Sequence, residues 1–256
     1  MEKLNEGMNV ENLLIEGRNA VLEAFRSGKT IDRLYVLDGC KDGPVQSIIR
    51  EARKQDTIIT FVAKDRLDQM SRTRGHQGVV AQGAAYGYVQ VEDILEKARE
   101  KGEPPFVILL DGIEDPHNLG AIIRTANLAG AHGVVIPKRR AVGLTATVAK
   151  TSAGALNYTG VAKVTNLSAT IEQLKKEGLW FVCADMGGEL MYRLDLKGPI
   201  GLVIGNEGDG VSKLVREKCD MTASIPMKGE IDSLNASVAA GVLAYEIVRQ
   251  RLLGGG

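Results

Sequence analysis

Apolar and polar positions alternate in blocks along the chain, and the blocks predict an α/β protein. In the first part, apolar residues recur at helical spacing over 18–26 and 45–56. Strand-like segments rich in β-branched residues cover 31–38, 57–63 and 78–86. We therefore expect a small N-terminal α/β domain.

The second part alternates more regularly between strands and helices. Its strand candidates are continuous apolar runs, which is typical of parallel strands that helices cover on both faces. The expected strands cover 106–112, 133–137, 161–165, 180–185, 200–205 and 222–227. The expected helices cover 119–129, 145–155, 168–177, 211–218 and 235–252. The pattern predicts an α/β fold with a mostly parallel sheet.

A charged, helix-prone segment, VEDILEKAREKGEPP (91–105), separates the two parts and is broken by two adjacent prolines. This composition is typical of a domain boundary. We expect three regions: an N-terminal domain of residues 1–84, a linker of residues 85–104 and a C-terminal domain of residues 105–256.

Composition limits the class of protein. The 256 residues are 44% hydrophobic and 25% charged, which is ordinary for a globular protein. No apolar run approaches the roughly 20 residues that span a bilayer, and no signal peptide is visible. The three cysteines form no CxxC pair, so neither a disulfide framework nor a zinc site is indicated. We expect a cytoplasmic protein without a metal.

The net charge of zero hides an asymmetry. No Asp or Glu occurs between Pro116 and Ile171, a segment with six cations, so its charge is +6 and that of the remaining chain is −6. The six are Arg124, Lys138, Arg139, Arg140, Lys150 and Lys163. One interpretation is a buried Ala/Gly-rich core with a few solvated lysines. The consecutive cations 138–140 instead favour a surface that faces the phosphates of a nucleic acid.

Three segments carry polar residues directly after expected strands: DPHNLGAIIRTANLAG (115–130), GLVIGNEGDGVS (201–212) and IPMKGEIDSLNASVAAG (225–241). Ligands bind at the carboxyl ends of strands in open parallel sheets, so these segments predict one site. The site would contain no cysteine, no HExxH and no Ser-His-Asp set, and His117 is the only histidine near it. A reaction that depends on positioning an already reactive donor fits these residues better than hydrolysis.

Each segment also has a purely structural interpretation. Asn118 either caps a helix or contacts a ligand, and Arg124, six positions later, is not on the same helical face. The polar run 206–208 is either a plain turn or a place where a ligand approaches the main chain. Ser233 and Asn235 open a helix of small residues, and apolar packing alone would not select both.

In order and spacing, these segments resemble the three motifs of the SpoU/TrmH family of RNA 2′-O-ribose methyltransferases. The segments IEGRNAVLEAF (15–25) and GHQGVVA (75–81) also look like the family's accessory RNA-binding domain, which is similar to a small ribosomal-protein fold. The combination most resembles the bacterial 23S rRNA guanosine-2′-O-methyltransferase branch, although tRNA relatives share the catalytic motifs.

The resemblance implies a SPOUT catalytic domain with a deep trefoil knot, S-adenosyl-L-methionine as cofactor, an RNA substrate and a homodimer. By position, it implies that the cofactor is held by Gly205, Ile225 and Leu234, with Glu207 and Met227 close by. The implied catalytic residues are Asn118, Arg124, Glu207, Ser233 and Asn235.

The family's proposal gives removal of the 2′-OH proton to the arginine at the position of Arg124. A guanidinium is effectively never deprotonated in a protein, so we expect Arg124 to orient phosphate and stabilise developing alkoxide charge. Asn118, Ser233 and Asn235 are expected to place the ribose and Arg124, and Glu207 to orient the site.

RNA contacts are expected in both parts of the chain. In residues 1–84, the candidates are Arg72, Arg74 and His76, in a loop just before GVVAQG; in the C-terminal domain, they are Lys138, Arg139 and Arg140. Two alternatives stay open: the same chemistry on tRNA, and an RNA-binding protein without catalysis. The second would not need the cofactor motifs.

Overall fold

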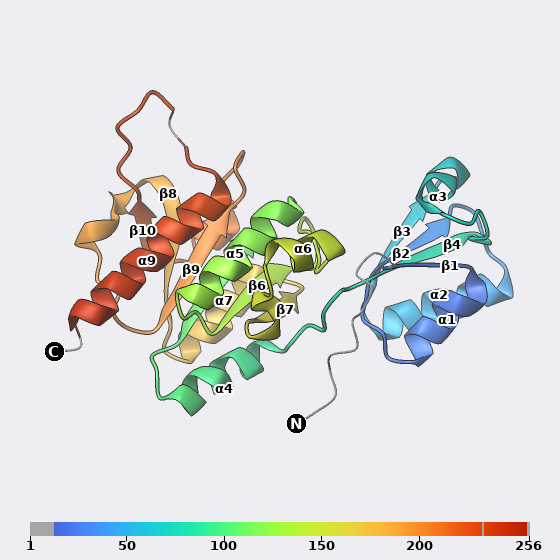
Figure 1. Cartoon of the computed structure of the whole chain (residues 1–256), viewed down its shortest axis with the longest axis horizontal. Coiled ribbons are helices and arrows are strands. Elements are labelled where there is room, and N and C mark those ends of the chain that lie inside the picture. The colour runs from blue at the N-terminus through green and yellow to red at the C-terminus, as the bar shows by residue number, and fades with distance from the viewer. Residues whose placement is uncertain (1–12, 232, 255–256) are drawn as a thin grey trace. The chain divides into compact units, whose positions relative to one another are not determined.

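A computed structural model describes residues 13–231 and 233–254 (Figure 1). The chain divides into two compact units. The first comprises residues up to Gly87 together with Gly143–Ala146, and the second comprises Tyr88–Val142 and Thr147 onward. Each unit is built on a sheet of its own.

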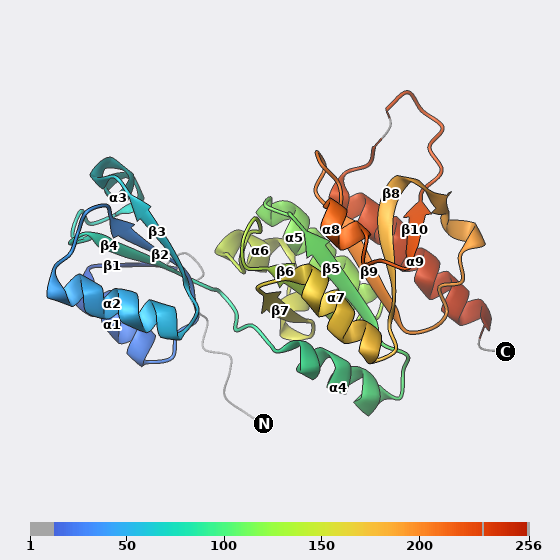
Figure 2. The same ribbon diagram turned by 180° about the vertical axis from the view of Figure 1, so that it is seen from behind.

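The first unit has a four-stranded sheet in the order β1-β4-β2-β3, in which only β2 and β3 are parallel. Its strands are β1 (Leu14–Glu16), β2 (Ile31–Leu37), β3 (Ile58–Val62) and β4 (Val79–Gly83). Its helices are α1 (Arg18–Arg26), α2 (Gly43–Lys54) and α3 (Lys64–Met70). Helices α1 and α2 lie side by side (Figures 1 and 2), and Val21, Phe25 and Ile48 pack against the sheet in one core. Strand β1 and helix α3 were not predicted.

The second unit has a six-stranded, wholly parallel sheet in the order β10-β8-β9-β5-β6-β7. Its strands are β5 (Phe106–Asp111), β6 (Gly133–Pro137), β7 (Gly160–Val164), β8 (Trp180–Leu190), β9 (Ile200–Gly205) and β10 (Met221–Ser224). Its helices are α4 (Val91–Lys101), α5 (Pro116–Leu128), α6 (Ala146–Thr151), α7 (Leu167–Lys176), α8 (Lys213–Arg216) and α9 (Ala236–Gly254), with short 3₁₀ turns η1 (Ala155–Asn157) and η2 (Met191–Arg193). The predicted α/β class and parallel sheet are confirmed.

Helices cover both faces of this sheet. Helices α5 and α9 pack against each other on one face (Figure 1), and α4, α7 and α8 lie on the other face (Figure 2). All residues of the central strands β5 and β9 are buried. Because burial on both faces needs apolar residues at every position, these strands are the continuous apolar runs of the sequence.

The expected linker, 85–104, contains α4. Val91, Ile94 and Leu95 of this helix are buried in one cluster with Val107 of β5. Its charged residues made the segment look like a solvated connection, but its apolar residues recur at helical spacing and form one face. Helix α4 is therefore part of the core of the second unit.

The sheet edge also differs from the prediction. Strand β8 extends to Leu190, through two glycines, although 180–185 was expected. At Gly188 a Cβ would lie 2.5 Å from the carbonyl oxygen of Thr222, so only glycine allows this close approach to β10. Strand β10 ends at Ser224, and 225–227, expected to continue it, lie outside the sheet.

Candidate active site

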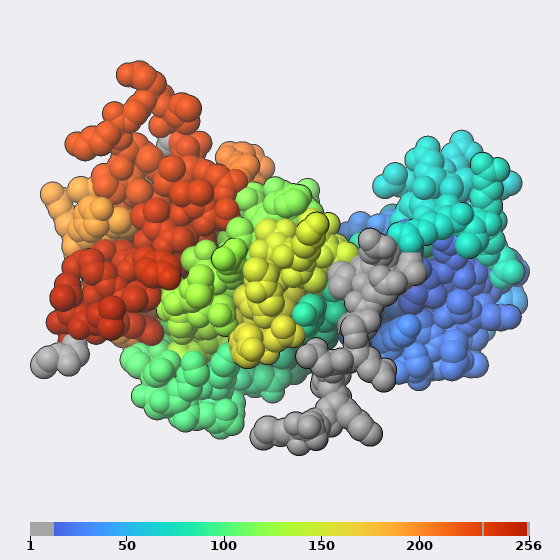
Figure 3. All heavy atoms as spheres, in the orientation of Figure 1, coloured from blue at the N-terminus to red at the C-terminus, as the bar shows by residue number. Residues whose placement is uncertain are grey.

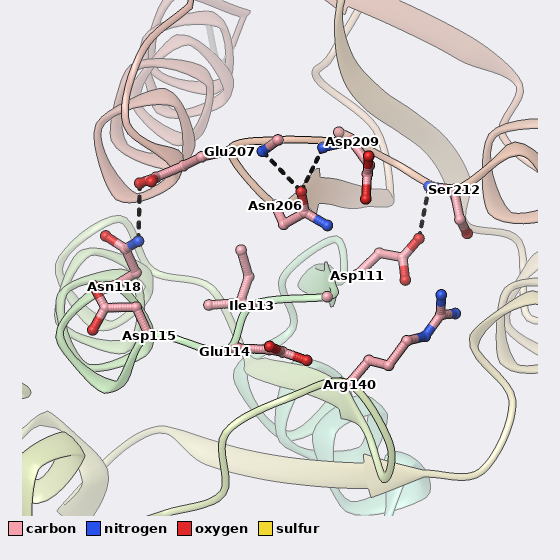
Figure 4. A pocket seen from close by; sticks show the side chains of 13 residues that line it. Asp111, Ile113, Glu114, Asp115, Asn118, Arg140, Asn206, Glu207, Asp209 and Ser212 are labelled. Carbon is pink, nitrogen blue, oxygen red and sulfur yellow. Dashed lines mark hydrogen bonds between the residues drawn. The ribbon is translucent and has the colours of Figure 1, made fainter.

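The first two motif segments line a pocket of about 390 Å³ at the carboxyl ends of β5 and β9 (Figure 4). This volume lies in the range of small-molecule sites, roughly 300–1,000 Å³. The third motif joins them beside this pocket through Asn235. The pocket is lined by Asp111, Gly112, Ile113, Glu114, Asp115, Asn118, Arg140, Asn206, Glu207, Gly208, Asp209, Gly210 and Ser212.

The second motif forms a tight turn at the end of β9. The side-chain oxygen of Asn206 accepts hydrogen bonds from the main-chain N–H groups of Gly208, at 2.9 Å, and Asp209, at 2.7 Å. A Cβ at Gly205 would collide with the main chain of Gly210, so the turn closes directly onto the strand. This arrangement fixes the direction in which Glu207 leaves the turn.

A buried carboxylate at the end of β5 joins this strand to the loop that follows β9. Asp111 is 6% exposed, and its Oδ2 accepts a 2.8 Å hydrogen bond from the main-chain N–H of Ser212. The next residue, Gly112, has φ +80°, and a Cβ there would lie 2.9 Å from the side-chain nitrogen of Asn206. Close packing of the two strand ends therefore requires this glycine.

The first motif places Asn118 in the first turn of α5. Asp115, not Asn118, caps this helix by accepting a 2.9 Å hydrogen bond from the main-chain N–H of His117. The amide nitrogen of Asn118 instead donates to Glu207 Oε1 at 3.0 Å (Figure 4). Asn118 is therefore not the cap of α5, and its side chain links the first motif to the second.

The third motif joins the same cluster through Asn235. Its amide nitrogen donates to Asn118 Oδ1 at 2.9 Å and also to Glu207 Oε1. Its side-chain oxygen accepts from the main-chain N–H of Ser237 at 2.9 Å and thereby caps α9. One side chain therefore starts the last helix and holds the other two motifs together.

Glu207 is the common acceptor of this cluster. Its Oε1 receives hydrogen bonds from Asn118 and Asn235 and a long one, 3.4 Å, from the main-chain N–H of Ala236. The carboxylate lies at the N-terminus of α9, where the helix dipole favours negative charge. Oε2 has no hydrogen-bond partner among the described residues, so it can accept a hydrogen bond from a ligand.

The structure does not bring Arg124 into this pocket. Arg124 is exposed on α5, and its guanidinium makes no hydrogen bond or ion pair with any residue that the structure describes. Ser233 and Met227 are also exposed, and Ile225 and Leu234 are half-buried. They belong to the segment between β10 and α9, which projects from the second unit in Figures 1 and 3.

Among the cations expected to contact RNA, Arg140 lines the pocket. It has φ +54°, which is uncommon outside glycine and is often found at functional sites. In Figure 4 its side chain reaches toward Asp111 and Ser212. Arg139 is exposed and Lys138 is half-buried.

In the first unit, Arg72 and Arg74 are exposed, but His76 is 6% exposed. Its Nε2 lies 3.0 Å from Asp68 Oδ1, and its Nδ1 accepts a 3.0 Å hydrogen bond from the main-chain N–H of Gly78. The expectation that His76 contacts RNA therefore does not agree with its placement. The side chain is used to shape the loop.

Sequence reasoning missed Asp111, Asp115 and Asn206. A signal was present for two of them. Asp115 directly precedes Pro116, an Asp-Pro pair that is typical of a cap and first helical position, although the helix was predicted to start only at 119. Asp111 is the polar end of an apolar strand. Asn206 stood in a motif whose plain-turn interpretation was considered, but no role in closing the turn was assigned to its side chain.

Comparison with known proteins identifies the class to which this fold and these loops belong. Residues 105–245 match the SpoU rRNA Methylase family, and residues 14–89 match the family described as RNA 2′-O ribose methyltransferase substrate binding. The first match covers more than half of the chain. The chain therefore belongs to the SpoU/TrmH family.

Similar proteins agree with this assignment. The chain is 49% identical, over 95% of its length and 98% of the relative's, to YacO of Bacillus subtilis, whose name assigns it to the TrmH family of tRNA/rRNA methyltransferases. It resembles the AdoMet-bound rRNA methyltransferase of Sinorhizobium meliloti (25% identity, TM-score 0.58, 93% of this chain and 87% of that one). It also resembles the TrmH/SpoU tRNA modifying enzyme of A. aeolicus (29% identity, TM-score 0.54, 64% of this chain and 85% of that one).

The protein is therefore an S-adenosylmethionine-dependent RNA 2′-O-methyltransferase. The loops at the end of the sheet fit this cofactor. The main chain of Ile225–Lys228 lies outside the sheet, and its polar groups have no hydrogen-bond partner among the described residues, so they are available to a ligand. No described helix is long and apolar enough to cross a membrane, and no group of three or more His, Cys, Asp or Glu that could hold a metal occurs among the described residues.

Proposed function

We propose that this enzyme methylates the ribose 2′-OH of a guanosine in 23S rRNA. The observation that carries the proposal is the hydrogen-bonded cluster of Asn118, Glu207 and Asn235 at the pocket, since it unites all three motifs. The preference for rRNA rests on the rRNA methyltransferase of Sinorhizobium meliloti, which aligns with 93% of this chain, whereas the tRNA modifying enzyme aligns with 64%.

The cluster acts on the ribose. Bound S-adenosylmethionine supplies a cationic methyl donor, and transfer to oxygen is an in-line displacement that depends on alignment. Glu207 Oε2 accepts the hydrogen bond of the 2′-OH, because the other oxygen of this carboxylate is already occupied. Asn118 and Asn235 fix the orientation of the carboxylate, and Ser233 contacts the ribose.

Cations hold the phosphates of the acceptor strand. Arg140 lies at the pocket and binds a phosphate next to the target nucleotide. Arg124, which is exposed, orients a phosphate and stabilises developing alkoxide charge in a homodimer whose two subunits complete each site. Lys138 and Arg139 extend the basic surface.

The cofactor is placed by the loops of the second and third motifs. Gly205, Ile225 and Leu234 hold it, with Glu207 and Met227 close by. The proposal includes the trefoil knot that the resemblance implies and the division of labour between domains. Residues 1–84 bind the RNA through Arg72 and Arg74, and 105–256 carry catalysis and dimerisation. The connection between the domains lies within 85–104, ahead of α4, which packs in the core of the catalytic part.

Mapping of ribose methylation in cells lacking the protein tests the function. Primer extension and mass spectrometry of 23S rRNA should show the loss of one 2′-O-methylguanosine, restored by the wild-type gene but not by the Glu207→Ala variant. Loss of a tRNA methylation instead would replace the rRNA assignment with the tRNA alternative. If ribose methylation is unchanged in both 23S rRNA and tRNA, the proposal is refuted.

A further inference from the structure

Glu16 in the first unit occupies an unexpected position for a carboxylate in an RNA-binding domain. It is the last residue of β1, beside the loop 71–78 that carries Arg72 and Arg74. A negative charge here opposes phosphate binding, so its presence needs a separate physical reason.

The reason lies in the hydrogen bonds that Glu16 accepts. Its Oε2 accepts from the hydroxyl groups of Ser71, at 2.6 Å, and Thr73, at 2.7 Å, and from the main-chain N–H of Thr73, at 3.3 Å. Its Oε1 accepts from the main-chain N–H of Arg72, at 2.7 Å. One side chain thus binds three consecutive loop residues.

The neighbouring residues close the other end of the same loop. Arg18 donates its main-chain N–H to the side-chain oxygen of Gln77, at 3.2 Å, and its Nε–H to the carbonyl of Gln77, at 3.0 Å. Gly17 has φ +86°, and a Cβ there would lie 3.2 Å from the carbonyl oxygen of Gly75. The segment 16–18 therefore holds the loop 71–78 in place at both of its ends.

The loop needs such support because its backbone is unusual. Arg74 has φ +56° and Gln77 has φ +49°, both in the left-handed region that non-glycine residues rarely adopt. Such conformations persist only when the surroundings impose them, and they gather at functional positions. Arg74 is exposed, and its side chain has no hydrogen bond or ion pair within the described part of the chain.

We propose that Glu16 is a positioning residue for RNA binding: it holds the 71–75 turn so that the Arg74 guanidinium is presented to an RNA phosphate. This inference rests on the proposed function of the first unit. The Glu16 carboxylate repels RNA phosphate. This repulsion is offset because the hydrogen bonds of Glu16 order Arg74, whose guanidinium binds phosphate bidentately.

Two effects of Glu16→Gln have opposite signs, and this makes a sharp test. Removal of a negative charge should tighten RNA binding if only electrostatics matters. Gln also places an amide donor against the N–H or hydroxyl donors of the loop, so loss of the ordered turn should weaken binding. We expect affinity for a 23S rRNA transcript to fall about fivefold or more, and the slope of log affinity against log salt to become shallower by about one.

The matched control is Glu23→Gln, the same chemical change at an exposed position of α1 whose carboxylate has no hydrogen bond among the described residues. It should leave RNA affinity unchanged or slightly tighter. Thr73→Val is a second variant: it removes a hydroxyl that bonds Glu16 without changing charge, and it should also weaken binding.

A double-mutant cycle separates positioning from general destabilisation. If Glu16 acts through Arg74, Glu16→Gln should have almost no further effect in the Arg74→Ala background. All variants are full-length, measured by filter binding to 23S rRNA and tRNA transcripts over a salt series, with cofactor affinity and thermal unfolding measured in parallel.

Wild-type-like or tighter binding by Glu16→Gln, or additive effects with Arg74→Ala, would overturn this inference while the proposed function stands. A wild-type chain that binds neither transcript would overturn the proposed role of the first unit and this inference with it. If the chain binds the tRNA transcript more tightly and the double-mutant cycle gives the same result there, the positioning role of Glu16 is supported. Only the proposed substrate then changes.

Discussion

Asn118 and Asn235 are joined by a 2.9 Å hydrogen bond although 117 positions separate them in the chain. Both also donate to the same oxygen of Glu207. A change at any one of the three should therefore disturb the other two.

Asn235→Ala should reduce methyl transfer about a hundredfold, because Asn118 and Glu207 lose their common partner and small misplacements are costly. It should also lower the free energy of unfolding by about 1 kcal/mol, since α9 loses its cap. Asn166→Ala is the matched control: Asn166 caps α7 by accepting from the main-chain N–H of Ala169 at 3.1 Å. A similar loss of transfer in both variants, measured by methyl incorporation, would reduce the role of Asn235 to stability.

Arg124→Ala should abolish transfer while cofactor affinity stays nearly unchanged, because Arg124 serves the acceptor. Arg124→Lys should also be poor, since lysine lacks the planar fork that binds phosphate bidentately. Single-turnover transfer and calorimetric cofactor titration give the two quantities. Loss of cofactor binding with retained turnover would contradict the assigned role.

S-adenosyl-L-methionine should bind the purified protein in excess chelator with the same affinity as without it. The prediction follows from the side chains around the site, because no group of three or more possible metal ligands occurs among the described residues. Isothermal calorimetry with and without chelator measures it. If the chelator weakens the binding of S-adenosyl-L-methionine, cofactor binding depends on a metal ion and the prediction is wrong.

A fragment of residues 88–256 should fold and bind the cofactor with nearly the affinity of the full chain. A fragment that starts at residue 105 lacks α4 and should be less stable, because Ile94 and Leu95 no longer cover Val107. The 88–256 fragment should bind RNA more weakly and with a shallower salt dependence, since it lacks the phosphate contacts of the first unit. Unchanged RNA affinity would contradict the RNA-binding role of residues 1–84.

Acid should release the loop that Glu16 holds. Burial of this carboxyl would raise its pKa, but hydrogen bonds from Ser71, Arg72 and Thr73 together lower it from 4.5 to about 2. A lowered pKa contributes stability that is complete above about pH 4.5 and is lost as pH falls toward about 2. Amide exchange of 71–79, corrected for intrinsic rates, should show protection that declines across this window. In Glu16→Gln the protection should be low already at pH 6 and change little with pH.

The sequence predicted most elements of the second unit, because buried parallel strands such as β5 and β9 need apolar residues at every position. It predicted the end of β8 wrongly, since Gly187 and Gly188 disfavour a strand locally. Their place in the sheet is decided by the close approach of Thr222 on β10, a contact between segments far apart in the chain.

The candidate site shows the same limit. The polar residues after the strands were visible, and the parallel sheet explains why their loops meet. That Asn118 bonds Glu207 while Asp115 caps α5 depends on side-chain orientation, which spacing does not determine. The six-residue offset puts Arg124 on a different helical face from Asn118, yet Arg124 was expected at the same site, and spacing alone did not decide between the two.

The double use of Asn235 has a consequence for selection and engineering. At many active sites, residues are suboptimal for stability, so a screen for heat resistance tends to remove them. Here the amide that starts α9 is the one that links Asn118 with Glu207, so a library sorted only for thermal resistance should retain it. Retention of Asn235 among heat-selected variants is therefore no proof that catalysis was under selection.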